Sequence, residues 1–325
     1  MSSASQTTEA QDSNNLPWLV VDPDGATKEG RTTLVDSKGE CHTRVIDALG
    51  SDMRYALTWQ GWILSLNPAG RQTFLSDPRT SDKIELPHLE QQLPRTFQCA
   101  LSDKPTNDGC VVVVLHPDKP TFWYCHVGGS EWIKHDYDVG KQQYDVKGLV
   151  WKEIVIHHLT SCEGRFHFDT SHIKHGILEF SPHPVIRLLE MRGIPDVVPP
   201  NPWGFAASAC CFELDGRIYR LFAYYIDNRS VITSIALYKM DMVRKRWCEV
   251  DEIGDQALLW SGYGGRCCSA SEFGLEPNCA YWINSSDKLL HIFDILKKTE
   301  RVCVPPKDIP KLSSKAFWLL PNPTD

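Results

Sequence analysis

Alternation of apolar and polar positions runs through most of the chain and predicts β-strands. In the stretch from Ile235 to Val250, apolar residues alternate with polar ones, a polar turn covers residues 241–246, and a return strand begins at Trp247. This pattern is typical of a strand pair with one solvated face. A hairpin of the same design runs from Cys279 to Ile295, and equivalent strands of the two units, such as the last strands at Trp247 and Val302, lie about 55 residues apart. This repeat length indicates a β-propeller.

Five units of this kind follow one another along the chain. Each contains a similar apolar strand, in turn ILSLNP, FWYCHVG, ILEFSP, ALYKMD and LHIFDI, and each ends in a last strand that begins at Ile84, Trp132, Val185, Trp247 or Val302. LPWLVVDPDG and two weaker strands after it predict an incomplete first sheet, which the terminal KAFWLLP (Lys315 to Pro321) is placed to complete. We therefore predict an all-β, single propeller of about six four-stranded blades, closed by N- and C-terminal strands. Seven blades is the alternative, because blade boundaries are imprecise in a sequence.

The propeller is predicted to occupy residues 16–325 as one domain. Residues 1–15 are almost entirely polar and predict a disordered tail. An apolar content of 42% is enough for one large core in a chain of 325 residues. The segment RLLEMRG, ending at Gly193, is the one passage that could form a helical turn, and its periodicity does not decide the matter.

Charge and hydropathy exclude several classes of partner. The net charge is -7 and there is no long basic run, which argues against nucleic acid. The basic cluster from Val243 to Arg246 is interpreted as a solvated hairpin turn. No apolar run approaches the roughly 18 to 20 residues that span a bilayer, and the N-terminus carries no signal or transit pattern. We expect a monomer in the cytoplasm, the nucleus or both, with no membrane partner.

Twelve cysteines are many for this length, but most lie in apolar strand sequence, where they behave as small buried hydrophobic residues. No CxxC pair is present, which removes the usual zinc-ribbon and thioredoxin-like signatures. The adjacent pairs Cys210-Cys211 and Cys267-Cys268 should point to opposite faces if they lie in strands. We expect reduced thiols, no metal and no cofactor.

Histidines crowd between His157 and His183, beside Cys162 and Asp169. A metal site needs three or four ligands that converge on one point, and residues on strands and turns splay apart. We interpret these histidines as surface and turn residues with mild pH sensitivity. The glycine-rich run from Gly262 to Arg266 lacks a P-loop context and is interpreted as a crossing between blades. The chain contains no GxSxG or HExxH motif, and we predict that it is not an enzyme.

Aromatic residues supply both a predicted core and a predicted binding surface. Large flat residues at repeated positions pack blades together, which is the expected role of most of Trp59, Trp62, Trp123, Trp132, Trp151, Trp247 and Trp282. Loops framed by Pro and Gly can instead present aromatic residues to a partner. The predicted partner-binding loops are residues 199–205 and 260–266, with Trp203, Phe205, Trp260, Tyr263 and Arg266 as the contact residues.

The region after residue 238 resembles the plant F-box-associated β-propeller family, a kelch-like family known as domain of unknown function 295 or the KIB-type propeller. The matching positions are Trp247, Val250, Ile253-Gly254-Asp255, Ala257-Leu258, Ser269, Gly274, Asn278-Cys279 and Tyr281. LPWLV, LSLNP and CVVVV also match, so the resemblance extends from about residue 16 to the end.

The resemblance implies a platform that binds a substrate or partner protein. Many family members carry an F-box before the propeller, which binds the Skp1-type adaptor of a ubiquitin ligase. In this chain only a polar tail precedes the first strand, so we expect an unidentified intracellular protein as partner and no Skp1-type adaptor. The alternatives are an enzyme or small-ligand binder that uses the central channel, and a structural remnant without a partner.

Overall fold

The computed structural model describes residues 17–21, 26, 27, 29–36, 40–67, 71–143, 151–171, 173–193, 206–226, 231–261, 264–283, 289–303 and 316–320. The predicted tail, residues 1–15, lies outside them. Among the described residues the one helical segment is a short 3-10 turn, η2 (Asp47–Leu49). No described helix has the length and hydropathy needed to cross a membrane.

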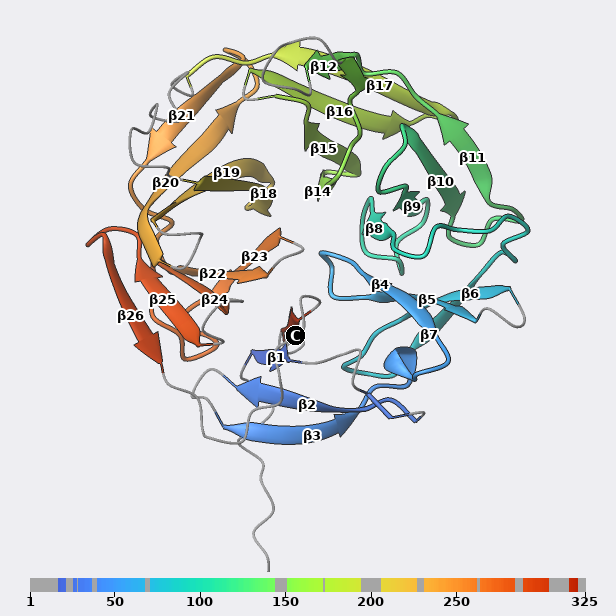
Figure 1. Cartoon of the computed structure of the whole chain (residues 1–325), viewed down its shortest axis with the longest axis horizontal. Coiled ribbons are helices and arrows are strands. Elements are labelled where there is room, and N and C mark those ends of the chain that lie inside the picture. Colours follow the sequence, from blue (N-terminus) through green and yellow to red (C-terminus); the bar gives the residue numbers. More distant parts are fainter. Residues whose placement is uncertain are drawn as a thin grey trace, which may run out of the picture.

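Six sheets stand in a ring around a common axis (Figure 1), so the prediction of a six-bladed all-β propeller is confirmed. From the innermost strand outwards, blade 1 has the order β27 (Phe317–Leu319), β1 (Trp18–Val20), β2 (Arg31–Asp36) and β3 (Cys41–Val45). In the same direction, blade 2 contains β4 (Arg54–Leu57), β5 (Ile63–Asn67), β6 (Gln72–Ser76) and β7 (Lys83–Leu86). Blade 3 contains β8 (Gln98–Leu101), β9 (Val111–Leu115), β10 (Thr121–His126) and β11 (Ile133–Asp136).

The remaining three blades follow the same chain order with one exception. Blade 4 contains β14 (Thr160–Cys162), β15 (Arg165–Asp169), β16 (Lys174–Phe180) and β17 (Pro184–Glu190). Blade 5 contains β18 (Ala206–Leu214), β19 (Arg217–Ile226), β20 (Val231–Asp241) and β21 (Arg246–Val250). Blade 6 has five strands: β23 (Gly264–Ser269), β22 (Gln256–Ser261), β24 (Cys279–Ile283), β25 (Leu290–Asp294) and β26 (Thr299–Cys303).

The two ends of the chain close the ring as predicted. β27 pairs antiparallel with β1, with Leu19 opposite Trp318, and supplies the inner strand that the first sheet otherwise lacks. The five predicted last strands correspond to β7, β11, β17, β21 and β26, each within a few residues of its predicted start. RLLEMRG is largely part of β17 rather than a helical turn.

Blade 6 departs from the predicted pattern. β22 pairs in parallel with β24, and β23 pairs antiparallel with β22 on the channel side. The interpretation of residues 262–266 as a crossing between blades is therefore wrong for Gly264 to Arg266, which belong to a strand. Gly265 lets this strand approach closely, because a Cβ there would lie 2.7 Å from the side chain of Leu258.

The third sequence unit, which contains ILEFSP, forms blade 4. This unit begins with LVWKEIVIHHLT, and the inner strand β14 starts only at the last residue of this segment, Thr160. Trp151 instead lies in β13 (Trp151–Glu153), which forms a separate two-stranded sheet with β12 (Lys141–Gln143). This tryptophan is 58% exposed and is therefore one tryptophan, of the seven considered for the core, that does not pack there.

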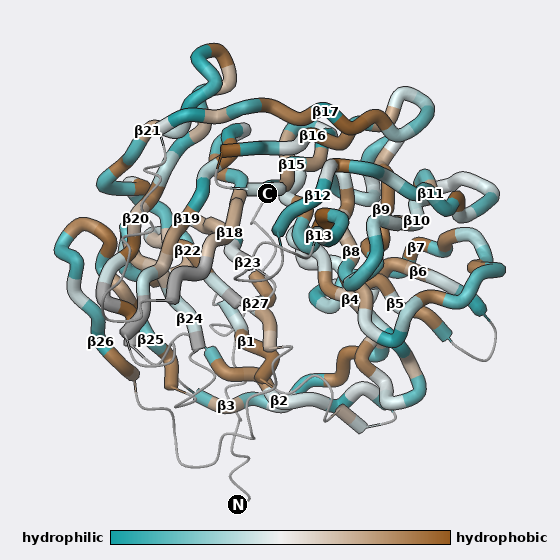
Figure 2. The backbone as a smooth tube through the Cα atoms, turned by 45° about the horizontal axis from the view of Figure 1, so that its top comes forward, coloured by the Kyte–Doolittle hydropathy of each residue, from teal (hydrophilic) through white to brown (hydrophobic). Residues whose placement is uncertain are grey.

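The cores lie between neighbouring blades, where the faces of adjacent sheets pack together. Trp62, Trp123, Trp247 and Trp282 are buried there, as predicted, while turns such as the one at Val243 are exposed. Cys210 packs against one core cluster and Cys211 against another, which confirms that adjacent cysteines face opposite sides of a strand. Figure 2 shows hydrophobic residues along much of β17 and hydrophilic ones at many connecting turns.

Two of the clustered histidines do not lie on the surface as expected. His167 in β15 and His175 in β16 are buried, and a hydrogen bond of 2.9 Å joins His167 Nδ1 to His175 Nε2. Antiparallel pairing places both strands in the interior of blade 4. The surface interpretation is wrong because a run of histidines does not show which side of a strand each faces.

Candidate functional site: an axial chamber

A polar cavity of about 400 Å³ lies at one end of the central channel. In blades 2 to 5 the chain passes from the innermost strand to the second strand in the same sense, so the connecting turns share one face of the propeller, which we call the inner-turn face. Residues in or next to these turns line the cavity, which we call the axial chamber, together with part of β23 from blade 6. Five blades thus contribute to one site.

The turn of blade 2 is held rigidly at the channel. Thr58 Oγ1 accepts a hydrogen bond from Trp62 N at 3.1 Å and donates one to Trp62 O at 2.9 Å. Gly61 in this turn has φ +84°, a value that favours glycine. A Cβ at Gly61 would lie 3.0 Å from Arg266 Nη1, so the turn packs directly beside that guanidinium.

Gln60 joins three blades across the channel. Its Nε2 donates to Leu101 O at 2.8 Å in blade 3 and contacts Ser161 Oγ at 2.5 Å in blade 4. A further link between blades is the bond of 3.1 Å from Thr160 Oγ1 to Cys211 O. These bonds hold the inner ends of blades 2, 3, 4 and 5 in a fixed arrangement around the chamber.

Two-residue turns place carboxylates at the chamber mouth. The β14–β15 turn has positive φ at Glu163 and Gly164, and the β18–β19 turn has positive φ at Asp215 and Gly216, as a type I′ turn requires. Glu213 Oε1 accepts a hydrogen bond of 2.6 Å from Gly216 N, which fixes this carboxylate. Glu163 and Glu213 are both exposed and line the chamber.

The loop after β8 supplies one more acid and a base. Asp103 Oδ1 accepts from Lys104 N at 2.7 Å, and Asp103 Oδ2 accepts from Asn107 Nδ2 at 3.0 Å. Asp103 and Lys104 are exposed and line the chamber. The mouth therefore carries three carboxylates and one ammonium group.

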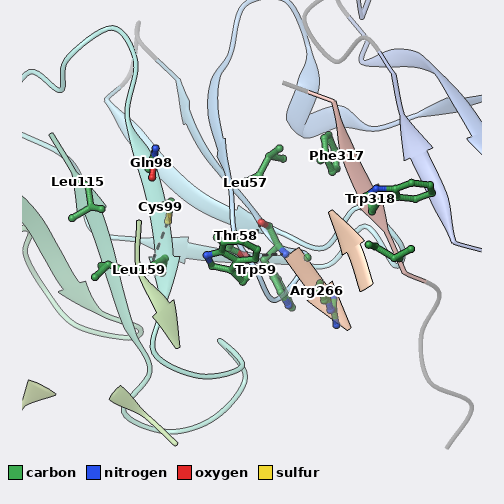
Figure 3. Close-up of a pocket in the computed structure, with 14 residues that line it drawn as sticks. Leu57, Thr58, Trp59, Gln98, Cys99, Leu115, Leu159, Arg266, Phe317 and Trp318 are labelled. Atoms are coloured by element: carbon green, nitrogen blue, oxygen red, sulfur yellow. Dashed lines mark hydrogen bonds between the residues drawn. The ribbon is translucent and has the colours of Figure 1, made fainter. Parts of the chain in front are cut away.

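Arg266, on β23, is the charged residue deeper in the chamber. It is partly buried, and it also lines a second, smaller cavity of about 60 Å³ with mostly apolar walls (Figure 3). Trp59 lines both cavities too and lies beside Thr58 in Figure 3. Burial, followed by the charge of the nearby Arg79 guanidinium, lowers the pKa of Arg266 to about 10.

Two carboxylates near Arg266 raise its pKa, but neither forms an ion pair with it. Asp77 is paired by Arg79, with Nε–Oδ1 at 2.8 Å and Nη2–Oδ2 at 2.5 Å. Glu213 raises the pKa of Arg266 only through its charge at a distance. Within the described ranges Arg266 takes part in no ion pair, so its donors remain available to a ligand.

The lining of the chamber combines charged groups, hydroxyl groups and thiols. None of the residues that line it is a histidine. The thiol of Cys162 lies at its edge, and burial, followed by the charges of Glu213 and Glu163, raises the pKa of that thiol to about 11. A thiol with such a pKa is protonated at neutral pH and a poor nucleophile.

The predicted contact residues are brought together only in part. Arg266 faces the chamber, but Trp260 lies in β22, is 9% exposed and packs near Trp282 with ring centroids 6.1 Å apart. The expectation of an exposed Trp260 loop is therefore wrong. Trp203, Phe205 and Tyr263 lie outside the described residues, and their contact role stays a prediction.

Sequence reasoning missed most of the chamber. Trp59, Gln60, Lys104, Glu163 and Glu213 were not predicted as site residues. Their equivalent positions in successive units could have identified them. In three blades a pair of residues ending in glycine connects the first strand to the second: Gln60-Gly61, Glu163-Gly164 and Asp215-Gly216. Equivalent turns of a propeller meet around its axis.

One group of possible metal ligands occurs in the described part of the chain. Asp36, Glu40 and His42 lie close together at the hairpin between the outer strands β2 and β3 of blade 1, and none of them lines the chamber. Asp36 Oδ1 accepts from Glu40 N at 2.9 Å, and His42 Nε2 lies 3.3 Å from Asp36 Oδ2. These hydrogen bonds stabilise the hairpin turn, which explains why the three side chains lie together.

Similarity to solved structures is low in sequence. A functionally unknown protein from Desulfotomaculum acetoxidans DSM 771 aligns with TM-score 0.42 and 11% identity over 95% of this chain and 100% of that one. The WD40 domain of SCAP from fission yeast aligns with TM-score 0.37 and 10% identity over 94% and 93% of the two chains. YCF48 bound to D1 peptide gives TM-score 0.36 and 11% identity over 92% and 80%.

The comparison with curated proteins found no match. The model of the KIB1-4 beta-propeller family matches residues 31–307. This range includes five complete blades and the outer strands of blade 1, and thus the whole axial chamber. The chain therefore belongs to the KIB1-4 beta-propeller family.

Proposed function

We propose that this protein is a protein-interaction module that holds an intracellular partner on the inner-turn face of its propeller. The observation that carries the proposal is the axial chamber. Five blades contribute to its lining, and exposed charged side chains surround its mouth. The Arg266 guanidinium in it forms no ion pair with any described residue. A rigid scaffold that gathers loop residues from several blades is typical of a binding platform.

The family supports the same conclusion. Its resemblance to propellers that follow an F-box implies a role in holding a substrate or partner. The F-box itself is a separate helical unit, and the described residues of this chain form strands with a single 3-10 turn. We propose that this chain does not bind a Skp1-type adaptor directly and acts in the cytoplasm, the nucleus or both.

Binding of a small molecule in the chamber is the second candidate function. Its support is the volume of about 400 Å³, which lies within the range of small-molecule pockets. Catalysis has less support, because the chamber combines a protonated thiol with no histidine among its lining residues. A ligand that fills the chamber without any protein partner would favour this second function.

Affinity purification of the tagged chain from cells, with quantitative mass spectrometry, tests the proposal. We expect a reproducible partner whose recovery falls when Arg266 is replaced by Ala, with a loss of about 2 kcal/mol of binding free energy for a central contact. Trp203→Ala tests the loop contact predicted from the sequence in the same way. Recovery of a Skp1-type adaptor by direct binding, or of no specific partner at all, would contradict the proposal.

A further inference from the structure

The Arg266 guanidinium lines the axial chamber, is partly buried and forms no ion pair among the described residues. Burial lowers its pKa to about 10, as expected where the surroundings disfavour the charged form. The Asp77 carboxylate nearby already holds Arg79 through two hydrogen bonds. An anion placed against Arg266 would regain the interactions that burial removes.

The shape of a guanidinium defines the preferred anion. Its planar set of N–H donors matches the two oxygens of a carboxylate or of a phosphate group. The lining of the axial chamber carries two cationic residues, Lys104 and Arg266, against three anionic ones, Asp103, Glu163 and Glu213. This excess of negative charge disfavours a polyanion such as a nucleotide phosphate chain and favours a single carboxylate.

The acidic mouth defines what must surround that carboxylate. Glu213 is fixed by its hydrogen bond to Gly216 N, and Asp103 by its bonds to Lys104 N and Asn107 Nδ2. Both remain exposed, and so does Glu163. Ammonium or N–H groups beside the carboxylate would be attracted by this mouth, whereas a bare anion would be repelled on its way to Arg266.

We propose that the axial chamber binds the carboxylate of an acidic residue in a partner peptide, paired with Arg266, while basic residues on either side of it contact the acidic mouth. The proposal rests on the function proposed above and names the chemistry that the partner must present. The same chemistry could come from a free dicarboxylic acid, and the experiment distinguishes the two sources.

The test uses the purified full chain and pools of short peptides blocked at both ends. One pool has Glu at the centre with Lys on both sides, a second has Gln at the centre, and a third has Glu with Ser on both sides. We expect the first pool to bind at least tenfold more tightly than the second and severalfold more tightly than the third. Free glutarate, measured in the same titration, should bind much more weakly than the first pool.

Two variants show whether the preference depends on the chamber. Arg266→Gln should abolish the preference for Glu over Gln, a loss of about tenfold or more, and Glu163→Gln should weaken the preference for Lys. The matched control is Arg187→Gln in outer strand β17, where the arginine pairs with Glu179 at the surface. This control should leave all preferences intact. Circular dichroism and melting temperature must show each variant to be folded.

Three outcomes would overturn the inference: no preference for the Glu pool, an unchanged preference in Arg266→Gln, or glutarate binding as tight as the peptides. If cells still yield a specific partner in any of these cases, the proposed function stands and only the carboxylate assignment fails. If the peptides behave as expected but no partner is recovered from cells, the proposed function fails and the chamber remains a carboxylate site.

Discussion

Two buried or partly buried arginines differ in their partners. One lies in the contact between blades 4 and 5, and the other lines the axial chamber. Arg220 in β19 is buried, forms an ion pair with Asp169 from β15, and has its guanidinium carbon 4.5 Å from the centre of the Trp247 ring. Arg266 in β23 has no ion pair within the described ranges. Burial lowers both pKa values, to about 9 for Arg220 and about 10 for Arg266.

The contact between blades 4 and 5 is a closed network. Asp169 Oδ1 accepts a bond of 2.9 Å from His175 Nδ1, and Asp169 Oδ2 lies 3.1 Å from Cys211 Sγ. His175 in turn bonds to His167. Each of these side chains is used by another side chain of the propeller, so this region stabilises the fold. The chamber, by contrast, keeps donors and charges available, as the proposed binding of a partner requires.

The largest effect is expected when the closed network loses its anion. Asp169→Ala leaves the Arg220 charge buried without its partner and should lower the free energy of unfolding by about 3 to 5 kcal/mol. Urea unfolding followed by circular dichroism measures this, with Asp251→Ala at an exposed position as control. A loss no larger than that of the control would show that the network does not stabilise the contact between blades.

Removal of the aromatic wall of the same network should have a similar effect. Trp247 in β21 is buried under Arg220, and Trp247→Ala should cost about 3 to 5 kcal/mol through the cavity that it leaves. Trp151→Ala is the matched control, because that tryptophan is exposed in β13. Equal shifts in melting temperature for the two variants would place Trp247 outside the core.

Acid should weaken the network through its histidines. Burial lowers the pKa of His175 to about 4 and that of His167 to about 3, and Arg220 already occupies the Asp169 carboxylate that could otherwise favour a charged His175. In the unfolded chain the two histidines take up protons near pH 6.5. The stability of the folded state is therefore at its full value above that pH, and it falls as the pH is lowered towards 4. Each histidine should reduce the unfolding free energy by up to about 1.4 kcal/mol per pH unit in this range.

A pH series of urea unfolding curves measures this slope. His167→Gln should make the slope shallower, because one of the two titrating groups is gone. His157→Gln serves as control, since His157 is exposed. Stability that stays constant between pH 6.5 and 4.5 would contradict the buried, neutral state of both histidines.

The smallest effect on stability is expected in the chamber. Arg266→Ala removes a charge that has no ion pair in the described part of the chain, so we expect a change in unfolding free energy below about 1 kcal/mol in either direction. The same urea experiment gives the value beside Asp169→Ala. A loss comparable to that of Asp169→Ala would show that Arg266 has a structural partner and would remove the contrast between the two regions.

Local pattern was enough to predict the ring of blades. Period-two alternation and repeated strand sequences located five last strands, and the lone strand at residues 317–319 was correctly assigned to blade 1. Pairing inside blade 6 could not be predicted, because β22 and β24 pair directly and in parallel although β23 lies between them in the sequence. Strand propensity gives no partner or direction when the chain departs from simple hairpins.

The site was less predictable than the fold. Arg266 was selected with four aromatic residues as a loop surface, and the strand β23 places it instead among polar turns of other blades. Glu163 and Lys104 are unremarkable in sequence, since each is an ordinary exposed residue next to a turn. Their meeting depends on the closure of the ring, which brings residues far apart in the chain to one axis.

The most direct test of this account is the recovery of partner protein by the Arg266→Gln chain, compared with wild-type chain at equal amounts of folded protein. The account predicts a melting temperature close to wild type and a loss of bound partner of about tenfold or more. Full recovery of every partner by folded Arg266→Gln chain would contradict it.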